Sequence, residues 1–270
     1  MSLNAKTLFI TGASRGIGRE IALRAARDGA NVVIAAKSAE PHPKLAGTIH
    51  SVAEEVEAAG GKALALQLDV RDENAVREAM ARAAEHFGGI DGLVNNAGAI
   101  KLVGVERLEP KRFDLMFQIN TRAVMVCSQA ALPYLKQSQG HILSLSPPLN
   151  LNPRWFQHHT AYTIAKYAMS LCTLGMSAEF RGTVAVNSLW PRTIIGTAAI
   201  AMLKGAAEFD NCRKPEILAD AAHAVLTRDA KTCTGHFFID DEVLAEEGVT
   251  DLEPYAFKPG APLAPDIFLD

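Results

Sequence analysis

The beginning of the sequence constrains the fold more than any other part, because an apolar run leads directly into a glycine-rich turn and then into a helix pattern. Residues 7–11 (TLFIT) suit a buried parallel strand. Residues 12–18 follow at once and space their glycines as G-x-x-x-G-x-G. Residues 19–28 place apolar side chains on one side of a helix, and Gly29 ends it. A strand, a glycine turn and a helix in this order are the setting of a dinucleotide-binding site.

Each part of this setting has a physical role. Glycine lets the backbone come close to a pyrophosphate, and the first turn of the helix offers free N–H groups and the positive end of its dipole. An ordinary loop between a strand and a helix is the alternative interpretation. The glycine spacing and the N-terminal position favour the dinucleotide site.

Strand-like and helix-like segments alternate along the rest of the chain. We expect strands at 7–11, 31–36, 63–68, 91–95, 140–146, 183–189 and 235–239, and helices at 16–28, 47–59, 72–87, near 110–136, 158–180 and 215–228. This alternation predicts an α/β fold, a single Rossmann-type doubly wound parallel sheet with helices on both faces. Ligands of such sheets bind beyond the carboxyl ends of the strands, where Gly12, Asp69, Asn95, Ser146 and Pro191 are expected.

The composition narrows the class of protein. The chain has 270 residues, enough for one full core, and its 27 basic and 30 acidic side chains give no reason to expect a nucleic acid or an anionic membrane as partner. We find no apolar run near 18 residues and no signal peptide, and the end DIFLD is not a peroxisomal address. We expect a cytoplasmic protein without a metal site, in which the scattered cysteines are small buried hydrophobes: Cys127, Cys172, Cys212 and Cys233.

Tyr162 and Lys166 form a candidate catalytic pair. They are four residues apart in AYTIAKYA, so on a helix they share one face. A nearby ammonium group favours the phenolate and lowers the pKa of a tyrosine from about 10. The spacing alone also arises by chance, so the pair gains weight only from the motifs around it.

Four motifs in the same order carry a family resemblance. They are TGASRGIG at 11–18, NNAG at 95–98, Asn120 in FQIN, and the pair Tyr162 and Lys166. Over about residues 5–240 the chain resembles the classical short-chain dehydrogenase/reductase family. Three segments, AAKSAEPHPKLAGTIH, HILSLSPPLNLNP and YAFKPGAPLAPDIFLD, are similar to one subgroup whose members can carry a sterol-carrier domain after this region, and we expect this chain to stop before one.

The residues after the second predicted strand bear on the choice of cofactor. The strand NVVIAA ends without the acidic residue that binds the ribose 2′-hydroxyl of NAD, and Lys37 and Ser38 follow it. Lys37 and Arg15 favour a 2′-phosphate, so we predict NADP(H) in preference to NAD(H). A solvated surface lysine is the alternative for Lys37. The resemblance implies that Asp69 and Val70 meet the adenine, and Asp69 can also cap a helix.

The resemblance implies the chemistry of the site. A hydride moves between the nicotinamide and a carbonyl or carbinol carbon, and Tyr162 gives or takes the proton. Lys166 would lower the pKa of Tyr162 and hold the nicotinamide ribose, and Asn120 would hold a water that links Lys166 to solvent. A local hydrogen bond inside a helix is the alternative for Asn120. Asn95 is expected to tie the central strands together.

The catalytic serine of the family is displaced in this sequence. Aligning GHILSLSPP with the family pattern puts Ser146 on the first serine and Pro147 on the second, usually catalytic one, and proline has no donor. Ser146 either reaches the site through a reshaped turn or only ends a strand. Substitute donors could come from the lengthened loop, at Trp155, His158 or His159.

Two regions near the C-terminus also depart from the family. Arg192 replaces a glycine in the segment that begins at Pro191, and either Thr193 or Thr197 could meet the nicotinamide carboxamide. The following segment, 197–212, reads as a short apolar lid helix and a polar loop, or as a plain connection.

We predict a cofactor-binding domain over residues 1–240 and an extension over 241–270. The extension is too apolar for a disordered tail, so we expect it to pack on the domain, cover the site or reach a neighbouring subunit.

The sequence therefore predicts an NADP(H)-dependent oxidoreductase that acts on a lipid-like secondary alcohol or ketone and forms a homodimer or homotetramer. An NADP(H)-binding sensor or scaffold with impaired catalysis is the alternative, and a sugar-nucleotide epimerase is disfavoured by the glycine spacing. The predicted catalytic residues are Tyr162, Lys166, Asn120 and Ser146. The predicted cofactor-binding residues are Gly12, Ser14, Arg15, Gly16, Ile17, Gly18, Lys37, Asp69, Val70, Asn96, Ala97, Gly98, Tyr162, Lys166, Pro191 and Thr193.

Overall fold

A computed structural model describes residues 2–43, 45–204 and 209–270 of the chain. Its described strands form one seven-stranded sheet in the order β3-β2-β1-β4-β5-β6-β7, with every pairing parallel. The strands are β1 (Thr7–Thr11), β2 (Asn31–Ala36), β3 (Lys62–Gln67), β4 (Gly92–Asn95), β5 (His141–Ser144), β6 (Ala185–Trp190) and β7 (Phe237–Ile239). The order reverses between β1 and β4, which is where doubly wound sheets bind their ligands.

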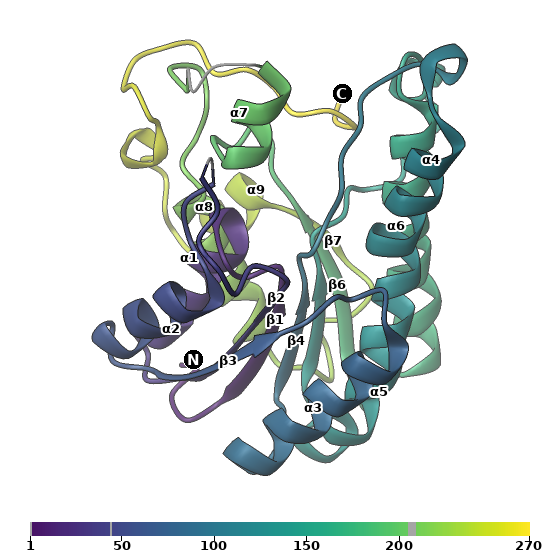
Figure 1. Ribbon diagram of the computed structural model, residues 1–270. Helices are drawn as coiled ribbons and strands as arrows, with labels where there is room; N and C mark the ends of the chain where they lie inside the picture. Colours follow the sequence, from purple (N-terminus) through teal and green to yellow (C-terminus); the bar gives the residue numbers. More distant parts are fainter. Residues whose placement is uncertain (1, 44, 205–208) are drawn as a thin grey trace.

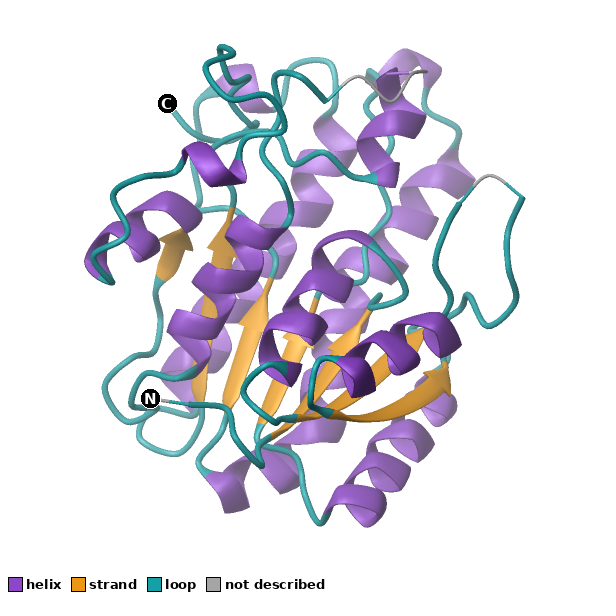
Figure 2. Cartoon of the chain, turned by 90° about the vertical axis from the view of Figure 1, so that its left-hand side faces the viewer, coloured by secondary structure: helices purple, strands orange, loops and turns teal. Residues whose placement is uncertain are grey.

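Helices cover both faces of the sheet (Figures 1 and 2). One face carries α1 (Gly16–Ala26), α2 (Ile49–Ala58), α8 (Glu216–Leu226) and α9 (Asp240–Glu246). The other face carries α3 (Glu73–Phe87), α5 (Ala123–Ser138) and α6 (Thr160–Glu179). Short helices complete the described chain: α4 (Pro110–Met116), α7 (Ala198–Lys204), the π-helix η2 (Phe117–Arg122) and the 3₁₀ turns η1 (Val105–Arg107), η3 (Pro153–Trp155) and η4 (Glu253–Tyr255).

The strand β1 shows why the sheet needs both layers. Leu8 and Ile10 lie in the core on the α1 side, whereas Phe9 lies in the core on the α3 side. All three side chains are almost fully buried. Each contributes roughly 1.5–3 kcal/mol through the burial of apolar surface. A strand with apolar residues at successive positions therefore needs a layer of helices on each face of the sheet.

The predicted fold class is confirmed, and the main differences lie in the helix predicted near 110–136. That region is α4, η2 and α5 in succession, because the backbone widens to π-helical geometry around Asn120. The sequence did not predict α9. The expected lid helix coincides with α7, whereas residues 205–208 of the same segment lie outside the described residues. Within the described ranges, no helix has both the length and the apolar character needed to cross a bilayer.

The C-terminal segment returns across the carboxyl ends of the strands after α9 (Figure 1). Isolated β-bridges join Ala256 to Arg213 and Pro265 to Thr193. Near the end of the chain, Phe268 is fully buried in a core cluster with Tyr162 and Trp190. The last residues are thus part of the folded body.

Candidate active site

A cavity of about 530 Å³ opens beyond the carboxyl ends of the central strands. It collects residues from the glycine turn, from the ends of β2, β3, β4 and β6, from α6, and from the C-terminal segment. Most of the predicted site residues line it: Gly12, Ser14, Arg15, Gly16, Ile17, Lys37, Asp69, Val70, Asn96, Ala97, Gly98, Asn120, Tyr162, Lys166 and Pro191. Three predicted residues, Gly18, Ser146 and Thr193, are not among its lining residues.

The glycine turn leaves the N-terminus of α1 free to bind an anion. Arg15, at the N-cap, makes no capping hydrogen bond with its side chain, and the first turn of α1 contains no acidic residue. Among the described residues, no side chain therefore accepts a hydrogen bond from the N–H groups of this turn. This arrangement fits the pyrophosphate of a dinucleotide.

Asn96 holds the glycine turn in place. Its Nδ2 donates to the carbonyl oxygens of Thr11 at 2.9 Å and Gly12 at 3.1 Å. A Cβ atom on Gly18 would lie 2.4 Å from the same Nδ2 and 2.9 Å from the Gly12 carbonyl oxygen. Gly18 is thus needed for the close packing of α1 on the end of β4, and it supports the cofactor cradle from behind.

Arg15 is held above the turn by a loop from residues 45–48. Its Nε donates to the Ala46 carbonyl at 3.0 Å and its Nη2 to the Gly47 carbonyl at 2.8 Å. Gly47 has a φ of +91°, and a Cβ atom there would lie 2.3 Å from the Ser14 carbonyl oxygen. The loop can approach only because this residue is glycine.

Lys37 lies at the same end of the cavity, and its ammonium group is already paired. Lys37 Nζ is 3.2 Å from Asp69 Oδ2, and the side chain is 63% exposed. Arg71 donates from both Nε and Nη2 to the Asp69 carboxylate. These hydrogen bonds, followed by those of Lys37, hold the pKa of Asp69 below its usual range.

Tyr162 and Lys166 lie on one face of α6, where both are buried and line the cavity. Lys166 Nζ donates to the Leu145 carbonyl and lies 4.8 Å from the centroid of the Trp190 ring. Burial lowers the pKa of Lys166 to about 7. The Tyr162 hydroxyl makes no hydrogen bond to a residue that the structure describes. Burial raises the pKa of Tyr162, with a smaller contribution from the charge of Asp266. Lys166 is not among the causes of this shift, so its expected lowering of the pKa of Tyr162 stays a prediction.

Asn95 and Asn120, which belong to the motifs that carry the family resemblance, both form hydrogen bonds that link parts of the fold. Asn120 is fully buried in η2, where its Oδ1 accepts from the Ala99 N–H at 2.8 Å and its Nδ2 donates to the Ala99 carbonyl at 2.9 Å. Its side chain therefore fixes the loop after β4. Asn95 Nδ2 donates to Ser128 at 3.4 Å and Ser144 at 3.5 Å, which links β4 to α5 and β5.

Ser146 points away from the cavity. Its Oγ forms a 2.8 Å hydrogen bond with Ser188 Oγ, which in turn donates to Thr173 Oγ1 at 2.8 Å. Of the three substitute donors considered, none lines the cavity. His158 is exposed, His159 bonds to Thr163, and the buried Trp155 Nε1 has no hydrogen-bond partner among the described residues.

A comparison with protein families decides the classification. The family model described as short chain dehydrogenase matches residues 6–205, which is most of the chain. The chain belongs to the short-chain dehydrogenase family. Members of this family are oxidoreductases that use nicotinamide cofactors, and the family resemblance drawn from the four motifs is confirmed.

Individual members of the family are highly similar to this chain. Hydroxysteroid dehydrogenase-like protein 2 of Xenopus laevis is 60% identical over 265 residues, which cover 98% of this chain and 63% of the relative. The chain spans about half to two thirds of the length of such curated relatives. A solved protein from Xanthomonas campestris is 60% identical, with a TM-score of 0.97 and full coverage of both chains. A short chain dehydrogenase from Mycobacterium thermoresistibile is 50% identical, with a TM-score of 0.94 over 100% of this chain and 96% of its own.

In this short-chain dehydrogenase, the segment after β6 brings only one of the two candidate threonines to the cavity. Thr197 lines the cavity and lies next to Gly16 of the glycine turn. Thr193 is buried in the bridge to Pro265, with its hydroxyl unpartnered within the described residues. Arg192 turns outward, where it forms ion pairs with Asp241 and Glu242.

Among the lining residues of this short-chain dehydrogenase that the sequence reasoning missed, two come from the end of the chain. Asp266 and Ile267 reach the cavity from the C-terminal segment. The apolar composition of residues 255–270 indicates that this segment packs on the body, but nothing in its pattern tells which face it covers. The segment is also far along the sequence from every other site residue.

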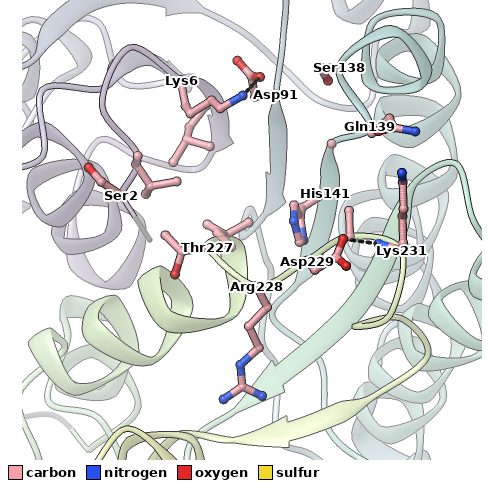
Figure 3. Close-up of a pocket in the computed structure, with 15 residues that line it drawn as sticks. Ser2, Lys6, Asp91, Ser138, Gln139, His141, Thr227, Arg228, Asp229 and Lys231 are labelled. Carbon is pink, nitrogen blue, oxygen red and sulfur yellow. Dashed lines mark hydrogen bonds and ion pairs between the residues drawn. The ribbon is translucent and has the colours of Figure 1, made fainter.

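A second cavity, of about 230 Å³, lies at the amino ends of the strands, and Figure 3 shows its lining residues. It is lined by residues at the amino ends of the strands, among them His141 and the ion pair of Lys6 and Asp91, whose Nζ and Oδ1 are 2.9 Å apart. None of the predicted site residues lies there. Of these two cavities, only the first is lined by predicted site residues.

Proposed function

We propose that the protein is an NADP(H)-dependent oxidoreductase that moves a hydride between the nicotinamide and a secondary alcohol or ketone. The observation that carries the proposal is a single cavity that joins the free N-terminus of α1 to the Tyr162 and Lys166 pair. A cofactor held at one end and a proton-transfer group at the other are what such a reaction needs.

Different residues around the cavity would bind different parts of the cofactor. The glycine turn and the first turn of α1 would bind the pyrophosphate, and Asp69 and Val70 would border the adenine. Lys166 would bind the nicotinamide ribose, and Pro191 and Thr197 would border the nicotinamide. When bound, the nicotinamide supplies or accepts the hydride.

Tyr162 would move the proton at the reacting oxygen. Its raised pKa keeps the hydroxyl protonated at neutral pH, so it can donate to an oxygen that gains negative charge during reduction. Because the Asn120 side chain is committed to Ala99, any water between Lys166 and solvent would be held by the Asn120 backbone at the π-helical turn.

The preference for NADP(H) rests on two cations at the adenine end. The Arg15 guanidinium donates to loop carbonyls, which carry no charge, so its positive charge is not neutralised by them. Lys37 and Arg71 both form ion pairs with the carboxylate of Asp69. No acidic residue follows β2 directly. Arg15→Ala should weaken NADPH binding by about 10- to 100-fold and NADH binding only slightly, since one lost phosphate contact is worth roughly 1.5–3 kcal/mol. A titration in which wild type binds NADH more tightly than NADPH would contradict the preference.

The substrate end of the cavity supports an apolar substrate. Side chains from the loop after β4, from α7 and from the C-terminal segment line it: Ile100, Leu102, Ile200, Leu203 and Ile267. A lipid-like alcohol or ketone would bury its apolar body against them.

Turnover of a ketone panel, followed by NADPH absorbance, tests the proposal. Tyr162→Phe should lower kcat by about 10²- to 10⁴-fold, the usual contribution of a general acid, while NADPH still binds. Tyr134→Phe on α5 is the matched control, because Tyr134 packs with the core away from the cavity and should keep wild-type activity.

A sensor or scaffold that binds NADP(H) is the second candidate, because the Ser146 hydroxyl is turned toward Ser188. That function predicts tight NADPH binding without turnover of any carbonyl compound, in wild type as well as in Tyr162→Phe.

We also propose that the protein is a homodimer or homotetramer. Large apolar side chains are exposed on the neighbouring helices α5 and α6, where Met125 is 49%, Leu171 55% and Leu174 49% exposed. Neighbouring exposed apolar residues favour association between copies.

A further inference from the structure

The segment 264–270, which we name the C-terminal strap, is fixed across one side of the active-site cavity. The Ile194 N–H donates to the Ala264 carbonyl at 3.0 Å, and the Asp266 N–H donates to the Arg192 carbonyl at 2.9 Å. Trp190 Nε1 donates to the Ile267 carbonyl at 3.0 Å. The strap is therefore held along the segment that follows β6.

Phe268 anchors the strap behind the catalytic tyrosine. Its side chain is fully buried, and its ring lies 6.2 Å from that of Tyr162, 5.8 Å from Trp190 and 5.1 Å from Tyr167, measured between centroids. Phe268 has a φ of +78°, an unfavourable conformation for a side chain of this size. Such a conformation persists only where the surrounding packing determines it, so the position of the strap is well defined.

Asp266 is the polar group that the strap adds to the cavity. One carboxyl oxygen, Oδ1, accepts a 2.7 Å hydrogen bond from the Ile267 N–H. The other makes no hydrogen bond to a residue that the structure describes. Asp266 lines the same cavity as Tyr162 and Lys166, and Phe268, two residues further along the strap, stacks on the Tyr162 ring.

The surroundings of Asp266 make its neutral form accessible near neutral pH. Burial raises the pKa of this carboxyl group to about 7, opposed by the hydrogen bond from the Ile267 N–H and the charge of Lys166 and reinforced by the charge of Asp240. The nearby Arg192 guanidinium turns away to Asp241 and Glu242. A protonated carboxyl group is a hydrogen-bond donor, as a serine hydroxyl is.

The usual donor to the substrate oxygen is missing from this cavity. Ser146 bonds to Ser188 outside the lining, and Pro147 has no donor. This inference rests on the proposed function. We propose that the carboxyl group of Asp266 makes the second polar contact to the reacting oxygen, beside Tyr162. Protonated Asp266 donates a hydrogen bond to the carbonyl oxygen and stabilises the negative charge that grows there. Asp266 is then a catalytic residue supplied by the C-terminal strap.

Infrared spectroscopy of a complex that cannot react tests this contact directly. The complex contains the protein, NADP⁺ and 2-decanone labelled with ¹³C at the carbonyl carbon. Each hydrogen bond to the oxygen weakens the C=O bond, so the carbonyl band of the wild-type complex should lie below that of the free ketone. Asp266→Ala should reverse a large part of this shift, and Asp266→Asn, whose amide group still donates, should keep most of it. An identical band in wild type and Asp266→Ala would overturn the proposal, as would the absence of any shift in wild type.

Steady-state kinetics separate Asp266 from Ser146. Asp266→Ala should lower kcat for ketone reduction by about 10²-fold or more, as the loss of one donor to a developing oxyanion does. Asp266→Asn should recover much of this loss, while NADPH affinity, followed by its fluorescence, stays within about twofold, because Asp266 is not among the residues proposed to bind the cofactor. Ser146→Ala should keep kcat within a few-fold, and Asp210→Asn, which removes an exposed partner of Lys258, is the control. A large kcat loss in Ser146→Ala together with normal kcat in Asp266→Ala would assign the role to the serine.

The two experiments distinguish this proposal from the proposed function. If wild type binds the ketone but transfers no hydride, the proposed function fails, and the carbonyl band still decides the role of Asp266. If wild type turns over ketones and Asp266→Ala does so equally well, the function stands and the role of Asp266 is wrong. A thermal unfolding curve for each variant checks that the strap remains folded.

Discussion

Gly18 shows how the absence of one side chain shapes the cofactor end of the cavity. The Asn96 amide occupies the space that a Cβ atom would need, and from there it binds the carbonyl oxygens of Thr11 and Gly12. The glycine therefore acts through Asn96. The same position would look like a direct phosphate contact from the sequence pattern alone.

Gly18→Ala should consequently displace Asn96 and loosen the glycine turn. We expect a loss of roughly 1–3 kcal/mol in the free energy of unfolding, because a buried amide loses its hydrogen-bond partners, and a weaker NADPH affinity. Urea unfolding and a fluorescence titration measure the two effects. Gly104→Ala is the control, since nothing lies within 4 Å of a Cβ atom at Gly104, and it should change neither quantity appreciably. Unchanged stability in Gly18→Ala would show that Asn96 is free to move.

At the scale of elements, the start of α9 secures the segment that follows β6. Asp240 is fully buried, and its Oδ1 accepts from the N–H groups of Arg192 at 2.9 Å and Asp241 at 2.8 Å. Its Oδ2 is buried without a partner in the described part of the chain. Burial raises the pKa of Asp240 to about 6, despite these hydrogen bonds.

This raised pKa predicts a pH-dependent contribution to stability. An aspartate in the unfolded chain titrates near pH 4, so between about pH 4 and 6 the folded protein holds this proton more strongly, and the contribution of Asp240 to stability falls as the pH rises. Asp240→Asn does not titrate and should gain stability relative to wild type between pH 4 and 7, by up to about 3 kcal/mol. Urea unfolding across this range measures the difference. Asp114→Asn, at an exposed position of α4, should follow the wild-type profile. A difference that stays constant with pH would refute the assignment.

At the scale of the whole molecule, the helices α5 and α6 present an apolar face to solvent on the side away from α1 and α8 (Figure 1). Pairing this face with that of a second copy would bury side chains that a single chain leaves exposed. It would also leave the cavity open, because the cavity lies at the ends of the strands.

Leu171→Glu combined with Leu174→Glu should therefore separate the proposed oligomer into single chains. Burying two carboxylates in an apolar interface costs several kcal/mol, which is more than a tenfold change in the dissociation constant. Analytical ultracentrifugation measures the subunit count. Leu151→Glu places the same charge on an 80% exposed loop residue and should leave the count unchanged. Equal sedimentation of all three proteins would place the interface elsewhere or exclude it.

Much of the fold could be predicted because its signals are local. The apolar run of β1, the glycine turn and the helix pattern of α1 are adjacent in the sequence, and their order already implies a buried parallel strand. Element bounds deviate by only a few residues, except where η2 interrupts a long helix. That interruption could not be predicted, because it depends on the contacts of Asn120 with Ala99 in another part of the chain.

The sequence by itself determined the family, the parallel sheet and the presence of Tyr162 and Lys166 on one face of a helix. Each of these follows from residue spacing within a short segment. Only the tertiary structure decided that Ser146 turns to Ser188 and that Asp266 enters the cavity. The physical reason is that a side chain points where packing and hydrogen bonds from distant segments allow, and the strap and Tyr162, about a hundred residues apart in the sequence, meet only in the folded chain.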